Sequence, residues 1–438
     1  MENNIATKSI GELCEEAYIE YGRELNSNRA LPLLMDGLKP VYRRVLYTIL
    51  KSNSNHFKTP NLIGEVLTIH PHGEKSMSGV ITQLVRRGIL REDANFGYYP
   101  IYGEGMSAAA PRYTETGITE KWYKLLKPLM SFAPLIPGEV EGIMEPAYIV
   151  SALPLACVYG ELGIGIGINT NIPSFSPKSM LEAYLHDDPT LLEPGIDLEF
   201  DRELCDFEGI WRQGKGQLIY KYHVWKDIAP DGSDGVYVSG DTLMFKPIWY
   251  KIEEWKATGH IFIRDESSGG KNLIFIGRNK GVRKVNQDMI YEECLKCCST
   301  DFCYEEIQKQ YRLGIHDGKI ARYIPLREWI DITYNNYINL VSKYRQANIE
   351  RIHFELLVNQ YLKQVAEILL NTKEDITNQD IANQLGIDLE IVNAITRKSI
   401  STLKRADTER IKANLEEELK EYERIDAKQF TNEIIENM

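Results

Sequence analysis

The sequence predicts a multidomain α+β protein built from three parts. Apolar residues recur with helical spacing in the first 130 residues and again from about residue 330 onward, whereas short β-rich runs separated by Gly and Pro fill the segment between them. A length of 438 residues accommodates two or three domains with cores of their own. We therefore place the domains at residues 10–130, 131–329 and 330–438.

The first domain is predicted to be a compact helical unit with a small β element. Pro40 begins a helix at a position where proline is well tolerated, and a second helix runs from about Glu74 to Arg87 after a turn at Pro71 and Gly73. Each helix has one apolar face and carries its basic side chains elsewhere. These helices and the Gly- and Tyr-rich wing NFGYYPIYGEG indicate a winged helix. An ordinary helical bundle with a basic surface fits the pattern equally well.

The second domain is predicted to be α+β, with helices between short strands. The strand-like runs, each bounded by Gly or Pro turns, are GIGIGIN, GQLIYKYHVW, GVYVSGDTLMFKPI and HIFIRDESSGGKNLIFIG. Four of the seven cysteines cluster near its end: Cys294, Cys297, Cys298 and Cys303. Because no second CxxC or HxxxH motif lies nearby, we expect packed free thiols rather than a zinc site.

The third domain is predicted to be a long antiparallel coiled coil with a small helical globule at its end, at about residues 366–400. A second charged helix, DTERIKANLEEELKEYERI, returns along the first. An arm of this kind has little core of its own, so a partner at the globule is expected. Nine positions of the first helix follow a 4-3 spacing, with one arginine among them: Leu340, Tyr344, Ala347, Arg351, Phe354, Val358, Tyr361, Val365 and Ile368.

The composition and the charge distribution narrow the class of protein. No apolar run approaches the roughly 20 residues that cross a bilayer, and the N-terminus lacks a secretory signal, so we expect a cytoplasmic protein.

The net charge is −12, yet residues 29–91 contain ten Lys or Arg and three acids, which leaves this segment at +7 and the remainder at −19. Phosphate binding depends on a local basic face. The segment therefore predicts a nucleic-acid interface.

Five motifs in one order carry a resemblance to a known family. RALPLLMDGLKPVYRRVLY, IGEVLTIHPHGEKS, NFG, AAAPRYTE and GIGIGINTNIPSFSP resemble the DNA-cleavage (A-type) subunit of type IIA topoisomerases, which includes the A subunits of gyrase and topoisomerase IV. The resemblance extends over roughly residues 10–430, and IRDES recurs at a matching place. It implies that the second domain is tower-like and that the globule is the C-gate, where two copies of the chain meet.

The resemblance implies roles for individual residues. Tyr113 matches the nucleophile that forms a 5′-phosphotyrosyl bond, and Arg112 beside it favours the phenolate and neutralises charge on the phosphorane. Arg29, His70 and His72 match the other catalytic residues that contact phosphate. On the residues alone, the two histidines could equally be a metal pair or core packing.

Further residues match DNA-binding positions. Ile172, in TNIP, matches the isoleucine that wedges between base pairs and bends the DNA, and Pro173 would stiffen a protruding tip. The basic residues that we expect at the DNA backbone are Lys39, Arg43, Arg44, Lys75, Arg86 and Arg87.

Several family features are absent from the sequence. It contains no P-loop, no GHKL-type ATPase motif and no acidic Mg²⁺-binding triad of a TOPRIM module. We therefore expect Mg²⁺ and ATP to bind a B-type partner with ATPase and TOPRIM modules, and no metal to bind this chain. The chain also stops where gyrase A subunits continue into a DNA-wrapping β-pinwheel, so introduction of negative supercoils is not expected.

Lys75 and Gly79 stand where the cellular enzymes of this family usually carry a small hydroxyl residue and an acid, so we do not expect the usual sensitivity to quinolones. The compact form of the chain resembles topoisomerases of viruses and mobile elements.

The expected function is ATP-dependent relaxation or decatenation of double-stranded DNA by a homodimer in an A₂B₂ assembly. A catalytically silent DNA-binding, architectural or assembly subunit that kept the fold is the alternative.

Overall fold

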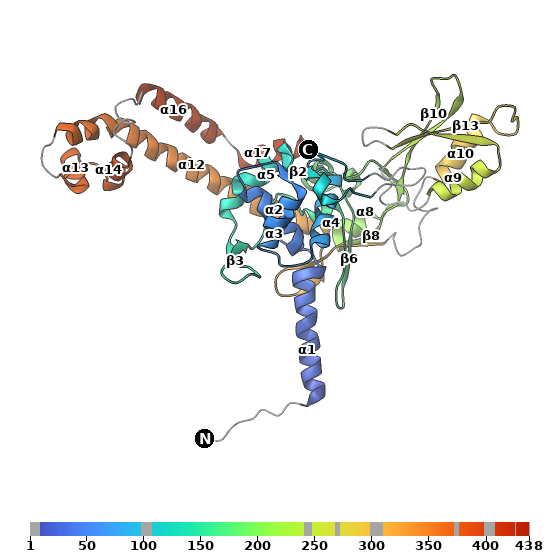
Figure 1. The fold of residues 1–438 in the computed structure, drawn as a ribbon, viewed down its shortest axis with the longest axis horizontal. Helices are drawn as coiled ribbons and strands as arrows, with labels where there is room; N and C mark the ends of the chain where they lie inside the picture. The colour runs from blue at the N-terminus through green and yellow to red at the C-terminus, as the bar shows by residue number, and fades with distance from the viewer. Residues whose placement is uncertain are drawn as a thin grey trace. The chain divides into compact units, whose positions relative to one another are not determined.

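The structure is a computed structural model, which describes residues 9–97, 107–240, 248–267, 272–297, 310–371, 376–397, 408–424 and 426–437 (Figure 1). It confirms an α+β architecture. The chain divides into two compact units, one of Met1–Tyr337 with Asn432–Met438 and one of Ile338–Thr431. One continuous helix, α12 (Leu326–Asn371), contributes residues to both units, and the predicted boundary near residue 330 stays a prediction. A division of the first unit at residue 130 stays a prediction.

The amino-terminal part of the first unit is helical, as expected. α1 begins at a capping box between Ser9 and Glu12, and α2 and α4 coincide with the two predicted helices. An additional helix, α3, lies between them and was not predicted; Pro60 stands in its first turn. The elements are α1 (Ile10–Leu25), η1 (Asn26–Ala30), α2 (Pro40–Lys51), α3 (Thr59–Leu67), α4 (Glu74–Arg86), η2 (Pro111–Tyr113), α5 (Glu120–Leu126) and η3 (Lys127–Phe132).

The core of this helical part is apolar and continuous. α2 buries Val45, Leu46 and Ile49, and α4 buries Ile81 and Leu84, so the apolar faces read from the sequence are the packed faces. The short strands β1 (Phe57–Lys58) and β2 (Glu115–Thr116) pair antiparallel and join this core to the segment after η2. Most of the predicted wing, residues 98–106, lies outside the described residues, so the winged helix stays a prediction.

The middle of the chain forms small sheets with helices between them. One four-stranded sheet has the order β5-β6-β14-β8 and another β10-β11-β13-β12; two-stranded pairs are β3-β4, β7-β9 and β15-β16. The strands are β3 (Leu135–Pro137), β4 (Met144–Pro146), β5 (Glu161–Ile164), β6 (Asn169–Ile172), β7 (Glu199–Phe200), β8 (Lys215–Gln217), β9 (Tyr220–Lys221), β10 (His223–Ile228), β11 (Asp234–Ser239), β12 (Ile261–Asp265), β13 (Leu273–Arg278), β14 (Gln310–Arg312), β15 (Gly314–His316) and β16 (Ala321–Tyr323).

Helices of this middle part are α6 (Ala156–Tyr159), α7 (Pro177–His186), η4 (Pro189–Leu191), α8 (Phe207–Gln213), α9 (Ile248–Ala257) and α10 (Gln287–Cys297). Cys294 of α10 is a buried free thiol, in line with the expectation for the cysteine cluster. Cys298, Cys303 and the side chain of Cys297 lie outside the described residues. No described helix combines the length and the apolar character that a bilayer span requires.

The elements that the structure describes in the second unit are all helices. α12 and α16 (Thr408–Arg424) run antiparallel, because Tyr344 contacts Tyr422 whereas Asn359, further along α12, donates a hydrogen bond to the carbonyl of Thr408. Arg351, the arginine of the heptad seam, bonds Glu418 of α16. α13 (Asn378–Leu385) and α14 (Leu389–Thr396) form a small apolar cluster with α12. A coiled coil stays a prediction. A last helix, α17 (Ala427–Glu436), follows α16.

Candidate active site

Tyr113 stands at the end of η2 on a fixed backbone. The next residue, Thr114, is buried; its hydroxyl donates a hydrogen bond to Thr59 Oγ1 (2.7 Å), and its carbonyl accepts one from Thr59 N (3.0 Å) at the start of α3. The Tyr113 side chain is nevertheless 64% exposed. The Arg112 guanidinium lies 4.6 Å from the centre of its ring. This is an accessible phenol beside a cation, held at a defined position.

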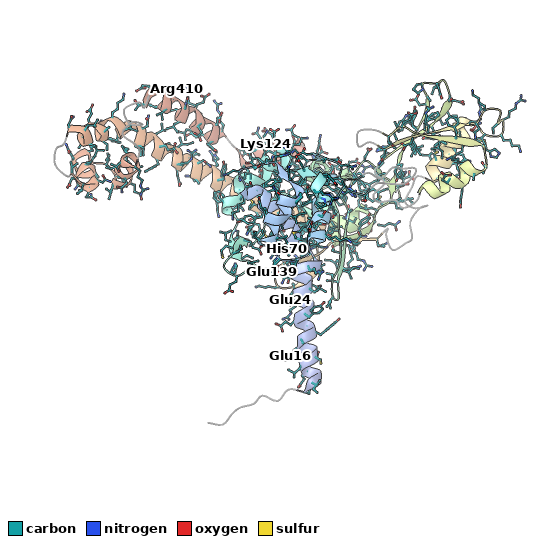
Figure 2. All side chains as sticks on the ribbon, in the orientation of Figure 1. Glu16, Glu24, His70, Lys124, Glu139 and Arg410 are labelled. Carbon is teal, nitrogen blue, oxygen red and sulfur yellow. The ribbon has the colours of Figure 1, made fainter. Side chains whose placement is uncertain are left out.

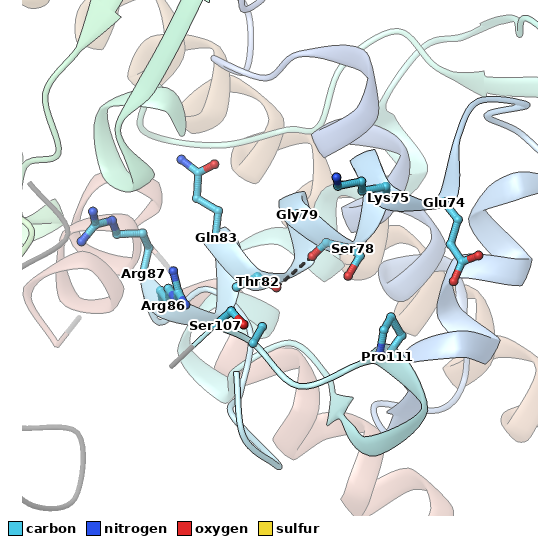
Figure 3. A pocket seen from close by; sticks show the side chains of 11 residues that line it. Glu74, Lys75, Ser78, Gly79, Thr82, Gln83, Arg86, Arg87, Ser107 and Pro111 are labelled. Carbon is cyan, nitrogen blue, oxygen red and sulfur yellow. Dashed lines mark hydrogen bonds between the residues drawn. The ribbon is translucent and has the colours of Figure 1, made fainter. Parts of the chain in front are cut away.

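A cavity of about 890 Å³ lies along α4, and its lining includes Pro111, two residues before Tyr113 in the chain (Figure 3). The segment Ser107–Pro111, which leads into η2, forms one wall. α4 forms the other wall because its apolar residues face the core and its polar residues face outward. Lys75, Arg86 and Arg87 line the cavity with Glu74 as the opposing charge. Arg86 also donates a hydrogen bond to the carbonyl of Phe96, and Arg87 to that of Tyr159. The cavity is therefore a basic channel beside Tyr113.

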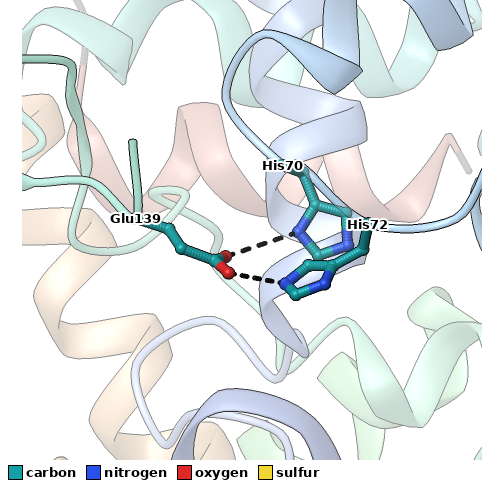
Figure 4. A group of neighbouring side chains, drawn as sticks. All are labelled: His70, His72 and Glu139. Atoms are coloured by element: carbon teal, nitrogen blue, oxygen red, sulfur yellow. Dashed lines mark ion pairs between the residues drawn. The ribbon is translucent and has the colours of Figure 1, made fainter. Parts of the chain in front are cut away.

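His70 and His72 lie between α3 and α4 and meet Glu139 (Figures 2 and 4). His72 Nε2 is 2.6 Å from Glu139 Oε1, and Arg44 Nη1 is 2.7 Å from Glu139 Oε2. Arg44 Nη1 also donates to His70 Nδ1 at 2.5 Å. Because a guanidinium only donates, that ring nitrogen is the unprotonated one. Burial and the adjacent Arg44 lower the pKa of His70 to about 4, so this histidine is neutral at neutral pH.

Arg44 itself is buried in the free chain, and its contact with the DNA backbone stays a prediction. Its Nε and Nη2 bind both oxygens of Glu145 (2.7 and 2.9 Å). A bidentate pair of this kind is strong and geometrically fixed. Arg44 thus ties α2 to the strand β4 and presents only Nη1 to the histidine cluster.

Two further basic residues are also held by carboxylates. Arg43 bonds the fully buried Asp36 at 2.7 and 3.2 Å, and Lys39 bonds the buried Glu161 at 2.8 Å. A buried acid that lost its cation would be left uncompensated. Lys39 and Arg43 therefore stabilise the fold, and their contact with the DNA backbone stays a prediction.

The hairpin of β5 and β6 buries Ile172, whose role as the wedge stays a prediction. In the antiparallel register Ile172 pairs with Glu161 at the base, and its side chain is 2% exposed. Ile164 pairs with Asn169 beside the turn and is 81% exposed. A residue that wedges between base pairs must protrude, and in the free chain Ile164 protrudes whereas Ile172 does not. The run GIGIGIN thus spans a hairpin turn, not one strand.

Glycines let this hairpin lie against the segment that carries Arg29. A Cβ at Gly163 would overlap the carbonyl of Ala30, and a Cβ at Gly165 would overlap the Asn26 side chain. The Asn26 side chain bonds the backbone N–H and carbonyl of Ile166. Arg29, in η1, is exposed. The hairpin tip and Arg29 therefore belong to one packed surface.

Among the described residues, His70, His72 and Glu139 form a group that could hold a metal ion, with ligand atoms within 4.8 Å of one another. The guanidinium of Arg44 already occupies His70 Nδ1 and one Glu139 oxygen, and its charge would repel a cation. The cluster is better suited to an anion. Within the described part of the chain, no hydrogen bond or ion pair connects Tyr113 or Arg112 to this cluster.

Sequence reasoning missed Asp36, Glu139, Glu145 and Ile164. Glu139 and Glu145 come from a segment far from α2 in sequence, so no local pattern could reveal them, whereas Asp36 lies only four residues before α2. Alternation in β5 did carry a signal for Ile164, because Leu162 and Ile164 point to one face and are both exposed.

Comparisons with known proteins support a DNA-binding, gyrase A-like class for this chain. Residues 29–193 match the family model of the A subunit of DNA gyrase/topoisomerase IV. The A subunit of DNA gyrase from Streptococcus pyogenes is 25% identical over 423 residues, covering 86% of this chain and 49% of that protein. The corresponding A subunits from Rickettsia conorii and Haemophilus influenzae are 25% and 26% identical, covering 84% and 76% of this chain and 43% and 40% of theirs.

The resemblance drawn from the motifs is therefore confirmed: the chain is similar to the A subunits of DNA gyrase. The match to the family model includes η1, α2, α3, α4, Tyr113 and the β5–β6 hairpin. The chain spans about half the length of the curated relatives it matches.

Proposed function

We propose that this chain is the DNA-cleaving subunit of a type IIA topoisomerase that is ATP-dependent through its partner and that relaxes or decatenates DNA. One observation carries the proposal. Tyr113 is exposed on a backbone that Thr59 and Thr114 fix, beside Arg112, inside the segment that matches the gyrase A family model.

Tyr113 would attack a backbone phosphorus. A bond forms between the phenolic oxygen and the phosphorus, the bond from that phosphorus to the 3′ oxygen breaks, and the phenolic proton ends on the 3′ hydroxyl. One phosphate ester replaces another, so the break can be resealed by the reverse step without an external energy source. Arg112 would neutralise charge that develops on the pentacovalent phosphorus.

The DNA would follow the basic channel along α4. Lys75, Arg86 and Arg87 line that channel, and Arg29 is exposed on the adjoining surface that carries the hairpin. His70 and His72 supply a cluster suited to an anion, with His70 kept neutral. Ile164 replaces Ile172 as the wedge, because its apolar side chain is exposed beside the hairpin turn.

The remaining parts of the assembly are proposals of the same kind. Two copies of the chain would meet at the globule of α13 and α14, the C-gate, and each would contribute one tyrosine to a pair of antiparallel strands. The helical part up to residue 130 would be the winged helix, and residues 131–329 the tower-like domain. Mg²⁺ and ATP would bind a B-type partner with TOPRIM and ATPase modules.

A direct test mixes the full chain with such a partner, Mg²⁺ and a duplex labelled at its 3′ ends, and then denatures the reaction. Labelled DNA fragments are expected to co-migrate with this chain for the unchanged protein and for Tyr123→Phe, an exposed tyrosine ten residues away. They should be lost for Tyr113→Phe. Label that remains after Tyr113→Phe contradicts the chemistry, and label that never appears favours the catalytically silent DNA-binding alternative.

A further inference from the structure

Glu139 occupies the anion position of the histidine cluster. It lies in the loop between β3 and β4 and reaches His72 Nε2 with one oxygen (Figure 4). Its other oxygen reaches Arg44 Nη1. A single negative group with two oxygens thus bridges a guanidinium and an imidazole. A phosphodiester presents the same charge and the same pair of acceptor oxygens.

The fold does not need this contact to neutralise Arg44. Glu145 already takes the Nε and Nη2 of that guanidinium in a buried bidentate pair. Burial opposes ionisation of Glu139, but the hydrogen bond and charge of Arg44 together with His72 lower its pKa overall, so it is a carboxylate at neutral pH. Two carboxylates therefore share one guanidinium, while His70 beside them is neutral.

Glu139 is also the member of the cluster that can leave. Its side chain is 38% exposed, whereas that of Glu145 is 11% exposed. His72, at 54%, is open to solvent as well. An ion pair between partly exposed groups is weak and is screened by salt. A DNA phosphate that approaches His72 therefore competes with a carboxylate that can be displaced without disrupting the Arg44–Glu145 pair.

We infer that Glu139 is an internal substitute for a DNA phosphate, which covers the Arg44–His70–His72 anion site in the free chain and is displaced when a duplex binds. This inference rests on the proposed function, because it takes the anion to be a DNA phosphodiester. Displacement of Glu139 costs free energy and so lowers the affinity for DNA. Glu139 therefore stays in the anion site until a duplex makes enough contacts elsewhere on the chain to displace it.

The test measures the affinity of the full chain for a short labelled duplex at low salt, for Glu139→Gln and for the control Glu141→Gln. Glu141 is exposed on the same loop and forms no ion pair within the described residues, so its replacement removes the same charge without opening the site. We expect Glu139→Gln to tighten binding by roughly three- to tenfold and Glu141→Gln by less than about twofold. The difference should shrink as salt is raised.

A second substitution, at His72, distinguishes competition between Glu139 and a DNA phosphate for the anion site from general repulsion between the Glu139 charge and DNA. In a chain that carries His72→Gln, the bridge between Glu139 and the imidazole no longer exists, so Glu139→Gln should add less than about twofold. An equal gain in both backgrounds, or an equal gain from Glu141→Gln, would overturn the inference. Inorganic phosphate should also bind Glu139→Gln more tightly than the unchanged chain; phosphate binding without a gain in duplex affinity contradicts the role in DNA recognition.

Failure of the inference is distinguishable from failure of the proposed function. If the unchanged chain binds duplex and forms the Tyr113 adduct while Glu139→Gln behaves like Glu141→Gln, the inference fails and the proposed function stands. If neither the unchanged chain nor Glu139→Gln binds duplex or forms an adduct, the proposed function fails as well.

Discussion

The two isoleucines of the β5–β6 hairpin should respond to alanine substitution in opposite ways. Ile172 is buried at the base, so Ile172→Ala removes packed methylene groups and leaves a cavity, with an expected loss of about 3 kcal/mol in unfolding free energy. Ile164 is exposed beside the turn, so Ile164→Ala should change that free energy by less than about 0.5 kcal/mol. Urea unfolding followed by circular dichroism measures both values.

Substitutions of Ile164 and Ile172 should also affect DNA bending and folding stability independently of each other. If Ile164 is the wedge, Ile164→Ala loses the apolar group that unstacks a base step, and a duplex labelled at both ends should show less end-to-end energy transfer on binding. Ile172→Ala, measured at a temperature where it remains folded, should bend DNA as the unchanged chain does. Normal bending by Ile164→Ala together with lost bending by folded Ile172→Ala would refute the reassignment.

Three further predictions concern the scaffold. Asp36→Asn should destabilise the fold by about 3 kcal/mol in urea unfolding, because Arg43 would lose its buried counter-charge; a loss below about 1 kcal/mol would contradict a structural role. Gly163→Ala should lower duplex affinity and the melting temperature together, because its Cβ would push the hairpin from η1; unchanged values would contradict that packing. The pKa values of His70 and His316 are near 4, mainly through burial, and lie below the unfolded value near 6.5. The unfolded chain then binds more protons, so stability is full above about pH 6.5 and falls by the order of 2–3 kcal/mol per histidine as the pH approaches 4; melting temperatures that stay flat from pH 7 to 5 would contradict this.

The sequence predicted elements where one local pattern decides the structure. α2 and α4 were predictable because their apolar residues recur at helical spacing and a Pro or Gly marks each start. α12 was predictable for the same reason, and its one seam arginine, Arg351, has a partner in Glu418. α3 was missed because it is short.

The sequence could not predict partners brought together by the fold. Arg43 and Arg44 lie off the apolar face of α2, which is why they were expected at DNA, yet Asp36 and Glu145 hold them in place. Whether Ile164 or Ile172 is exposed depends on where GIGIGIN turns, and the glycines that permit the turn are also those that pack against η1. Tyr113, by contrast, was recognisable from its motif, and the structure places it exposed beside Arg112.

The central claim is that Tyr113 becomes covalently joined to DNA. The most direct measurement traps the reaction of this chain with its partner, Mg²⁺ and duplex DNA by denaturation, digests the protein and the DNA, and identifies the modified peptide by mass spectrometry. The account predicts a nucleotide joined through its 5′ phosphate to Tyr113, and no such peptide from Tyr113→Phe. A nucleotide on another residue, or on Tyr113 through a 3′ phosphate, would contradict it.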